Sequence, residues 1–333
     1  KCSAIFLISK NKVMEALQFD LSKSNEVRLQ SEYFRNLPSC DFMEFAILFI
    51  NMKKRGKFFS MYKNLLDHFY KYQQFINRRF RTNQIGKEDI DDFVRYLHID
   101  KGLKLSTIKS MITKLKYLIE KAYLNGWAVD DSYSDAKVVE NDSTFVYLTE
   151  KEIARIYYYK GLTPWEEEIR DTFIVGCMTG QRYSDYSRLS ADNIKGDNIH
   201  ILQQKTKNKA VVPLTDYVRE VFAKYGGKMP RARCIQYFDK AIKKVCKKVG
   251  LDDLVVYEEE RAGEIVLVKK HKYEMISSHT ARRTFVTNMN KNNVPSEKTR
   301  KCTGHKSTAC FDRYDKMTLE DNARSLAGNG YLI

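Results

Sequence analysis

The sequence lacks the features of a membrane-spanning or secreted protein. No apolar run approaches the ~20 residues that are needed to cross a bilayer, so we exclude an integral membrane protein. The opening stretch, KCSAIFLISKNK, has too short an apolar segment for a signal-peptide core and no small-residue cleavage pattern. Five prolines and 15 glycines among 333 residues exclude a collagen-like or low-complexity chain.

Cysteine pairs at metal-binding spacing are also missing. The seven cysteines are odd in number and include no CxxC. This pattern argues against a disulfide framework and against a cysteine-based zinc site, and it indicates reduced thiols. We therefore expect a cytosolic protein.

Acidic residues are outnumbered by basic ones. The chain has 58 Lys and Arg against 42 Asp and Glu, which gives a net charge of +16. Such an excess favours a polyanionic partner, either nucleic acid or an acidic membrane surface. A membrane surface is the weaker hypothesis, because no helix pairs a wide apolar face with a basic one without also supplying core residues.

Length and hydrophobic periodicity predict two folded domains. We place an N-terminal extension or truncated arm region at 1–50, a helical domain at 51–130, a polar linker at 131–144 and a second domain at 145–333. The second domain begins with a helix that Thr149 and Glu152 should cap, and it contains predicted antiparallel hairpins over 198–214 and 255–268. The expected fold is mainly α with small antiparallel β elements, and it is not a doubly wound α/β sheet.

Basic residues line two helices of the first domain, predicted over 51–81 and 105–126 around an aromatic core. For any single lysine, a solubilising surface is the simpler interpretation. Two successive basic helices indicate a small clamp that contacts mainly DNA phosphates. The candidate DNA contacts are Lys53, Lys54, Arg55, Lys57, Arg78, Arg79, Arg81, Lys104, Lys109, Lys116 and, from the first hairpin, Lys207.

The second domain contains two clusters of charged candidate residues in its first half. Arg182 follows a Thr-Gly turn that ends an apolar helix, and Asp185 lies three residues later, where it could pin the guanidinium. An ordinary intrahelical ion pair is the commoner explanation. Lys205 lies at the hairpin tip, where its ammonium could reach a phosphate and deliver a proton. Solvated turn lysines, among them Lys207 and Lys209, are the plainer alternative.

Two further groups lie toward the C-terminus. A serine caps a helix that carries His279 and Arg282 near its N-terminus, a position that suits a phosphate. Zinc is excluded there, because no second His or Cys lies at ligand spacing from the histidine. A short helix ends at Gly304, His305 lies in the turn, and Tyr314 follows nine residues on. Taken singly, a surface helix and a packing tyrosine explain these residues as well.

Together the groups resemble the tyrosine recombinases, also called phage-type integrases. The matching pattern is an Arg after a Thr-Gly turn, a hairpin Lys, a His-x-x-Arg, a Gly-His and a Tyr nine residues further on. The resemblance covers 145–333 and extends loosely to the first domain, which then corresponds to the SAM-like core-binding domain. The second hairpin and the segment His-Thr-Ala-Arg-Arg-Thr-Phe look most like integrases of Bacteroides-group mobile elements.

The resemblance implies the roles of the matched residues. Tyr314 would attack a scissile DNA phosphate and leave a 3′-phosphotyrosine and a free 5′-hydroxyl. Arg182 and Arg282 would hold the nonbridging oxygens and offset the growing charge. Lys205 would protonate the departing 5′ oxygen, and His279 would assist proton transfer from the tyrosine.

The resemblance also implies a phosphate hydrogen bond from His305 and an orienting role for Asp185 near Arg182. It implies no metal and no ATP, because the phosphotyrosine conserves the bond energy, and the sequence contains no P-loop and no convincing carboxylate triad. An arm-binding domain would need more than residues 1–50, so we expect it to be absent or truncated.

The expected function is therefore site-specific recombination that integrates or excises a mobile element. The expected partners are double-stranded DNA with attachment or core sites, three further copies of the chain in a homo-tetramer, and an accessory DNA-bending or directionality factor, all at the bacterial nucleoid in the cytoplasm. A type IB topoisomerase-like enzyme is disfavoured by the spacing of Gly-His and Tyr. A catalytically silent DNA-binding protein is disfavoured because all six motif residues are present. For the helix predicted after Met317, packing on its own domain and docking on a neighbouring subunit remain open alternatives.

Overall fold

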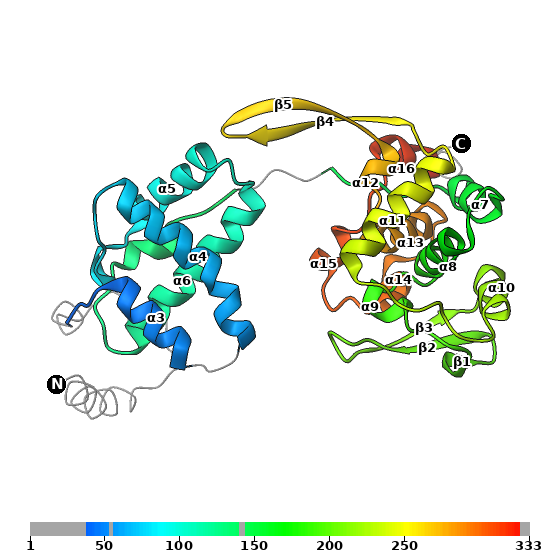
Figure 1. Ribbon diagram of the computed structural model, residues 1–333, viewed down its shortest axis with the longest axis horizontal. Coiled ribbons are helices and arrows are strands. Elements are labelled where there is room, and N and C mark those ends of the chain that lie inside the picture. Colours follow the sequence, from blue (N-terminus) through cyan, green and yellow to red (C-terminus); the bar gives the residue numbers. More distant parts are fainter. Residues whose placement is uncertain (1–37, 53–55, 140–143, 327–333) are drawn as a thin grey trace. The chain divides into compact units, whose positions relative to one another are not determined.

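The structure is a computed structural model of the 333-residue chain, and it describes residues 38–52, 56–139 and 144–326 (Figure 1). They form two compact units. The first unit comprises the described residues up to 139 together with Glu258–Val266, and the second comprises 144–257 and 267–326. No helix in these ranges is long and apolar enough to span a bilayer.

The first unit is helical around an aromatic core. Phe69 packs edge-on against Phe93, with ring centroids 5.1 Å apart, and Tyr72 and Phe80 complete the buried group. Rings at helical spacing on α4 supply much of this core, as predicted. The elements are α3 (Phe42–Met52), α4 (Gly56–Phe75), η3 (Thr82–Gln84), α5 (Lys87–Arg95), η4 (Tyr96–Asp100), α6 (Leu105–Leu124) and η5 (Asp131–Asp135).

The core of the first unit extends beyond the range 51–130 on both sides. Phe42 and Ala46 of α3 are fully buried in it, although α3 lies mostly in the stretch that we assigned to an N-terminal extension. After α6, Tyr133 and Ala136 are also buried in this cluster, although they lie in the predicted linker. Lys116 holds this segment in place by donating to the carbonyl oxygens of Ser134, at 3.0 Å, and Ala136.

The second unit is built around α8, a helix that is buried along most of its length. Helices α10, α11 and α13 pack on α8, and Figure 1 shows α8 beside α11 and α13. The elements are α7 (Glu150–Tyr158), α8 (Pro164–Thr179), α9 (Tyr183–Tyr186), η6 (Ala191–Asn193), β1 (Ile194–Lys195), β2 (Asn198–Leu202), β3 (Lys209–Pro213), α10 (Asp216–Lys224), α11 (Ile235–Lys248), β4 (Leu254–Arg261), β5 (Glu264–His271), α12 (Lys272–Met275), α13 (Ser278–Lys291), α14 (Ser296–Thr303), α15 (Thr308–Asp312) and α16 (Leu319–Leu326). Residues 258–266 of β4, β5 and the turn between them belong to the first unit.

Two antiparallel β elements accompany the helices, as predicted. Strands β1, β2 and β3 form a sheet in which Ile199 pairs with Val212 and Ile201 with Ala210. These four side chains face the core, and the alternate positions face solvent. Strands β4 and β5 form a separate two-stranded ribbon. The predicted fold class, mainly α with small antiparallel elements, is therefore confirmed.

Local sequence signals set the helix ends near the candidate residues. Thr149 and Glu152 form the predicted capping box of α7. Helix α14 begins after Pro295, and it ends at Gly304, whose φ of +69° is the left-handed conformation that favours glycine. These ends fix where the chain turns into and out of the site.

Helix α16 packs on α13 of its own chain. Asp321 accepts a hydrogen bond from the Tyr147 hydroxyl at 2.7 Å and pairs with the Lys291 ammonium at 2.9 Å. These contacts raise the pKa of Lys291 and lower that of Asp321, because each charge is stabilised by the other. In this single chain the tail helix packs on its own domain.

Candidate active site

A tight turn between α8 and α9 presents Arg182. Helix α8 ends at Gly180, whose φ is +63° and where a Cβ atom would lie 2.4 Å from the Phe285 ring. Arg182 follows as the N-cap of α9, with an extended backbone and a half-buried side chain. Only glycine fits at position 180 of this turn. The turn at Gly180 therefore determines where Arg182 lies in the site.

Arg282 is the most deeply buried charged side chain of the site. It lies in the second turn of α13, and its guanidinium donates to Gly180 O at 2.8 Å and to Thr303 O at 2.9 Å. Burial and the nearby Arg182 lower the pKa of Arg282 to about 10, so the group is still protonated at neutral pH. Its Nε is buried and has no hydrogen-bond partner among the described residues. A phosphate oxygen is a natural acceptor for such a donor.

The neighbouring Arg283 has a different environment. Its guanidinium lies 3.8 Å from the centroid of the Phe145 ring, which is a cation–π contact. The structure therefore separates two adjacent arginines: Arg282 points into the site and Arg283 stacks beside it.

His305 lies directly against Arg282. Its Nε2 is 2.8 Å from Arg282 Nη2, and its Nδ1 is 2.8 Å from the Thr303 hydroxyl. Arg282 Nη2 also lies 3.2 Å from Nδ1, but its shorter contact is with Nε2, and the Thr303 hydroxyl already donates to Thr299 O. Because arginine can only donate, we assign the lone pair of His305 to Nε2 and its proton to Nδ1. Burial and the positive charges of Arg282 and Arg182 lower the pKa of His305 to about 3. The ring is therefore neutral in the DNA-free chain.

Tyr314 packs over this group from the turn that follows α15. Its ring centroid is 4.9 Å from that of His305 and 6.4 Å from that of His279, and the Arg282 guanidinium lies 5.2 Å from the Tyr314 ring. Partial burial and Arg283 keep the pKa of His279 below its ordinary value. Three other predicted site residues, Arg282, His279 and His305, thus meet around Tyr314.

Lys205 stands apart from this group. It lies in the turn between β2 and β3, is exposed, and makes no hydrogen bond or ion pair with any described residue. Nearby Lys207 has a φ of +56°. A hollow of about 650 Å³ opens beside the turn and is lined by Lys207, Asn208, Lys209, Glu297, Arg300, Lys301, Gly304 and His305. The predicted lysine is on a loop beside the site, and its ammonium does not contact the other members.

The predicted pairing of Asp185 with Arg182 is wrong. Asp185 Oδ1 accepts the backbone N–H of Gln204 at 2.8 Å and lies 3.7 Å from Arg188. The reason is the extended backbone of Arg182, which takes its side chain off the helical face that a three-residue spacing implies. Asp185 instead joins α9 to the start of the turn that carries Lys205.

Sequence reasoning missed two buried amides, Gln181 and Gln203. Gln203 Nε2 donates to Gln181 Oε1 and to Thr303 O, both at 2.8 Å, and Arg182 Nη1 lies 3.5 Å from Gln203 Oε1. Both glutamines are fully buried. In the sequence, Gln181 is a polar residue before Arg182 and Gln203 is a polar residue after a predicted strand. Neither position is distinctive enough to predict a role in the site.

Several predicted DNA contacts have partners within the protein. Arg78 pairs with Asp89 at 2.9 Å, Arg81 donates to Ser39 Oγ at 2.8 Å, and Lys104 pairs with Glu259.

Lys116, as described above, holds carbonyl oxygens, and burial lowers its pKa. Arg79, Lys109 and Lys207 are exposed. Lys53, Lys54 and Arg55 lie outside the described residues, as does the side chain of Lys57.

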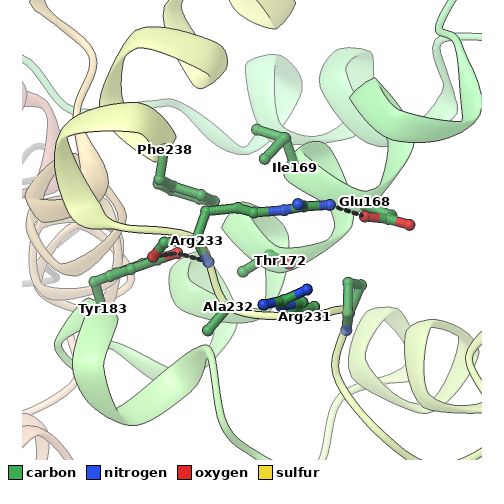
Figure 2. Close-up of a pocket in the computed structure, with 9 residues that line it drawn as sticks. Glu168, Ile169, Thr172, Tyr183, Arg231, Ala232, Arg233 and Phe238 are labelled. Carbon is green, nitrogen blue, oxygen red and sulfur yellow. Dashed lines mark hydrogen bonds and ion pairs between the residues drawn. The ribbon is translucent and has the colours of Figure 1, made fainter.

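A narrow cleft lies beside α9 and is lined by Tyr183 of that helix (Figure 2). The Tyr183 hydroxyl donates to Arg233 O at 2.9 Å, and Arg233 Nη2 lies 3.3 Å from Glu168. The cleft has room for little more than a water molecule. It anchors Tyr183, the residue after Arg182, and is too small for a substrate.

Within the described ranges, no group of three or more His, Cys, Asp or Glu side chains is arranged to hold a metal ion.

Two family models match the chain. The phage integrase family matches residues 146–320, and the phage integrase SAM-like domain matches residues 41–138. No curated protein matches the sequence significantly.

Solved structures share the fold at low sequence identity. A lambda integrase dimer bound to a COC′ core site has a TM-score of 0.63 at 16% identity, covering 93% of this chain and 87% of that chain. A Tn1549 transposon integrase in complex with circular intermediate DNA has a TM-score of 0.59 at 16% identity, with coverages of 86% and 98%. XerH recombinase bound to a palindromic difH substrate has a TM-score of 0.59 at 13% identity, with coverages of 80% and 78%. Since the first family model spans more than half of the residues, the chain belongs to the phage integrase family and is a site-specific tyrosine recombinase.

Proposed function

We propose that this recombinase cuts and rejoins duplex DNA through a covalent 3′-phosphotyrosine at Tyr314. The observation that carries the proposal is the convergence of Tyr314 and His305 on the buried guanidinium of Arg282, with His279 on the Tyr314 ring. A nucleophile beside a fixed cation suits attack on a phosphodiester.

The proposed step exchanges one phosphate ester for another. The Tyr314 oxygen forms a bond to phosphorus while the bond to the 5′ oxygen breaks, and His279 takes up the tyrosine proton. Lys205 gives a proton to the departing 5′ oxygen, which leaves as a hydroxyl. Arg182 and Arg282 hold the nonbridging oxygens as negative charge grows on the pentacoordinate phosphate.

His305 must change its hydrogen bonding for its proposed role. In the DNA-free chain its Nε2 accepts from Arg282 and therefore cannot donate to a phosphate. A phosphate between the arginines would offset their charges and raise the pKa of His305, so that the ring could be protonated and donate. DNA binding is then accompanied by proton uptake.

We further propose that neither a metal ion nor ATP takes part. The positive charges that a metal would supply are provided by Arg182, Arg282 and Lys205, and the phosphotyrosine keeps the ester bond for rejoining.

The assembly and the biological substrate are also proposals. Lambda integrase has been solved as a tetramer bound to a Holliday junction, and we propose a homo-tetramer on two duplexes for this chain, with an accessory DNA-bending or directionality factor. The β4–β5 ribbon and the segment His279–Phe285 favour an integrase of a Bacteroides-group mobile element that integrates or excises its element. The site of action is the bacterial nucleoid, in the cytoplasm.

A covalent-trapping assay tests the chemistry. The protein is mixed with labelled duplex from the ends of its host element in the presence of EDTA and analysed on a denaturing gel. We expect a protein–DNA band that survives EDTA and is absent for Tyr314→Phe, because only the phenol oxygen can form the ester.

Tyr237→Phe is a matched control, since Tyr237 is an exposed tyrosine of the same unit. It should leave the band unchanged. DNA binding without any covalent band, even on nicked duplex, would contradict the proposal and favour the silent DNA-binding alternative.

A further inference from the structure

One buried amide connects three parts of the proposed active site. Gln203 lies just after β2, two residues before Lys205, and is fully buried. Its Oε1 accepts a hydrogen bond from the Thr206 hydroxyl at 2.7 Å and faces Arg182 Nη1 at 3.5 Å. Its Nε2 donates to Thr303 O at 2.8 Å. Gln203 thus touches the lysine turn, the first arginine and the segment that leads to His305.

The contacts fix the turn on both sides of Lys205. Gln203 precedes the lysine and Thr206 follows it, and their side chains are bonded to each other. The Gln203 backbone also donates to Asn208 O at 2.9 Å and accepts from the Lys207 N–H at 2.9 Å. The turn is therefore closed upon the amide, while the Lys205 side chain itself stays exposed and unpaired within the described chain.

The Nε2 end of the Gln203 amide lies beside Arg282 and His305, the residues of the proposed phosphate pocket. Thr303 O accepts hydrogen bonds from Gln203 Nε2 at 2.8 Å and from Arg282 Nη2 at 2.9 Å. At Gly304 a Cβ atom would lie 2.5 Å from Gln203 Nε2, so the backbone approaches the amide as closely as glycine allows. The same carbonyl therefore relates the position of the lysine turn to that of Arg282.

We propose that Gln203 is a positioning residue that holds the Lys205 turn at the phosphate pocket, so that the ammonium meets the departing 5′ oxygen. The inference rests on the proposed function of Lys205 and Tyr314. A primary amide is suited to this task, because it donates on one side and accepts on the other without adding charge beside two arginines. Loss of the amide lets the turn move, and small displacements of a proton donor slow proton transfer strongly.

The test uses two versions of one DNA substrate. Both are duplexes from the element ends, and both contain an intact scissile phosphate at the position that the trapping assay maps. One has the natural 5′ bridging oxygen and the other has sulfur in its place. With sulfur, the bond from phosphorus to sulfur breaks and a thiolate leaves, which needs no proton because its conjugate acid has a pKa near 8.5.

We expect Gln203→Leu to slow covalent-complex formation on the oxygen substrate by about 10- to 100-fold and on the sulfur substrate by less than about threefold. An unchanged ratio between the two rates would overturn the proposal, since a general loss of structure slows both reactions alike. Thermal unfolding and DNA binding are measured alongside.

A second variant keeps the test decisive where Gln203→Leu does not fold. Thr206→Val removes only the hydroxyl that donates to the amide and keeps the shape of the side chain. It should shift the ratio in the same direction by a smaller factor. Asn193→Ala is the matched control, because its amide serves another turn of the same sheet, where it donates to His200 O.

Lys205→Ala distinguishes a failure of the proposed function from a failure of the proposed role of Gln203. If sulfur fails to restore its activity, the proposed role of Lys205 is wrong. If sulfur restores Lys205→Ala but not Gln203→Leu, the proposed function stands and the positioning role of Gln203 is refuted.

Discussion

At the scale of single residues, the site is defined by charges that repel one another when DNA is absent. Burial and the charges of Arg282, Arg182 and Arg300 all lower the pKa of His305. Because the folded chain keeps this histidine neutral, its contribution to the free energy of unfolding depends on pH. In the unfolded chain the same ring titrates near 6.5.

The sign of the pH effect follows from linkage. Between pH 6.5 and the folded pKa of about 3, the unfolded chain binds a proton at His305 that the folded chain does not. Acidification from pH 6.5 to 4.5 therefore favours unfolding, and His305→Gln removes this contribution. We expect the variant to lose less stability over that range, by a difference on the order of 1 kcal/mol because solvent screens a half-buried ring.

Urea unfolding at both pH values measures the difference. His200→Gln is the control, since His200 is exposed on β2. An identical pH dependence for wild type and His305→Gln would show that His305 is not held neutral.

The charged and aromatic residues that meet around Tyr314 could be picked out from the sequence, and the buried amides beside them could not. The arginines, histidines and Tyr314 carry titratable or nucleophilic groups in a spaced pattern. Gln203 carries none, and its partners Gln181 and Thr303 lie 22 and 100 positions away. Only the folded chain brings these three together, so no local pattern could reveal them.

At the scale of elements, α16 is attached to its own domain through polar contacts of Asp321. Asp321 is the common partner of Tyr147 and Lys291, and its carboxylate side chain is only 12% exposed. Replacing it leaves the Lys291 charge without its partner next to a phenol. One carboxylate thus provides both of these polar contacts for the helix that follows Tyr314.

We expect Asp321→Asn to weaken this attachment by about 1–3 kcal/mol, the range for a hydrogen bond to a charged group. Limited proteolysis should then cut near the C-terminal segment earlier than in the wild type. Glu320→Gln, at an exposed neighbouring position of α16, is the control. Equal cleavage rates for wild type and Asp321→Asn would mean that other contacts hold the helix.

The elements themselves were largely predictable, since capping signals and periodicity mark them. The ends of α7, α13 and α14 coincide with Thr149, Ser277 and Gly304. The extent of the first unit was harder to predict, because α3 and the segment after α6 join its core by contacts distant in sequence. Linker-like composition around Tyr133 did not reveal that its ring is buried.

At the scale of the whole molecule, the net charge of +16 governs association with DNA. Not every basic residue contributes through phosphate contacts. Lys116 binds carbonyl oxygens and Arg78 pairs with Asp89, whereas Arg79 is exposed. Composition alone could not tell these lysines and arginines apart.

The salt dependence of DNA binding should distinguish them. For Arg79→Ala we expect the slope of log affinity against log salt concentration to become shallower by about 1, because one phosphate contact is lost. Lys116→Ala should keep the slope and lower the unfolding midpoint. Fluorescence anisotropy over a salt series, with thermal unfolding of both variants, provides the measurement. An unchanged slope for Arg79→Ala would place that side chain away from the DNA.

The packing of the Tyr314 ring over Arg282 has a consequence for the cell interior, which is rich in small phosphate compounds. A free phosphate ion would have to displace the ring before reaching the guanidinium, and one ion offers few contacts in return. A DNA duplex makes many contacts at once and can drive the displacement. We therefore expect the ring to weaken the binding of a small anion at Arg282 more than the binding of a duplex, which gains many further contacts.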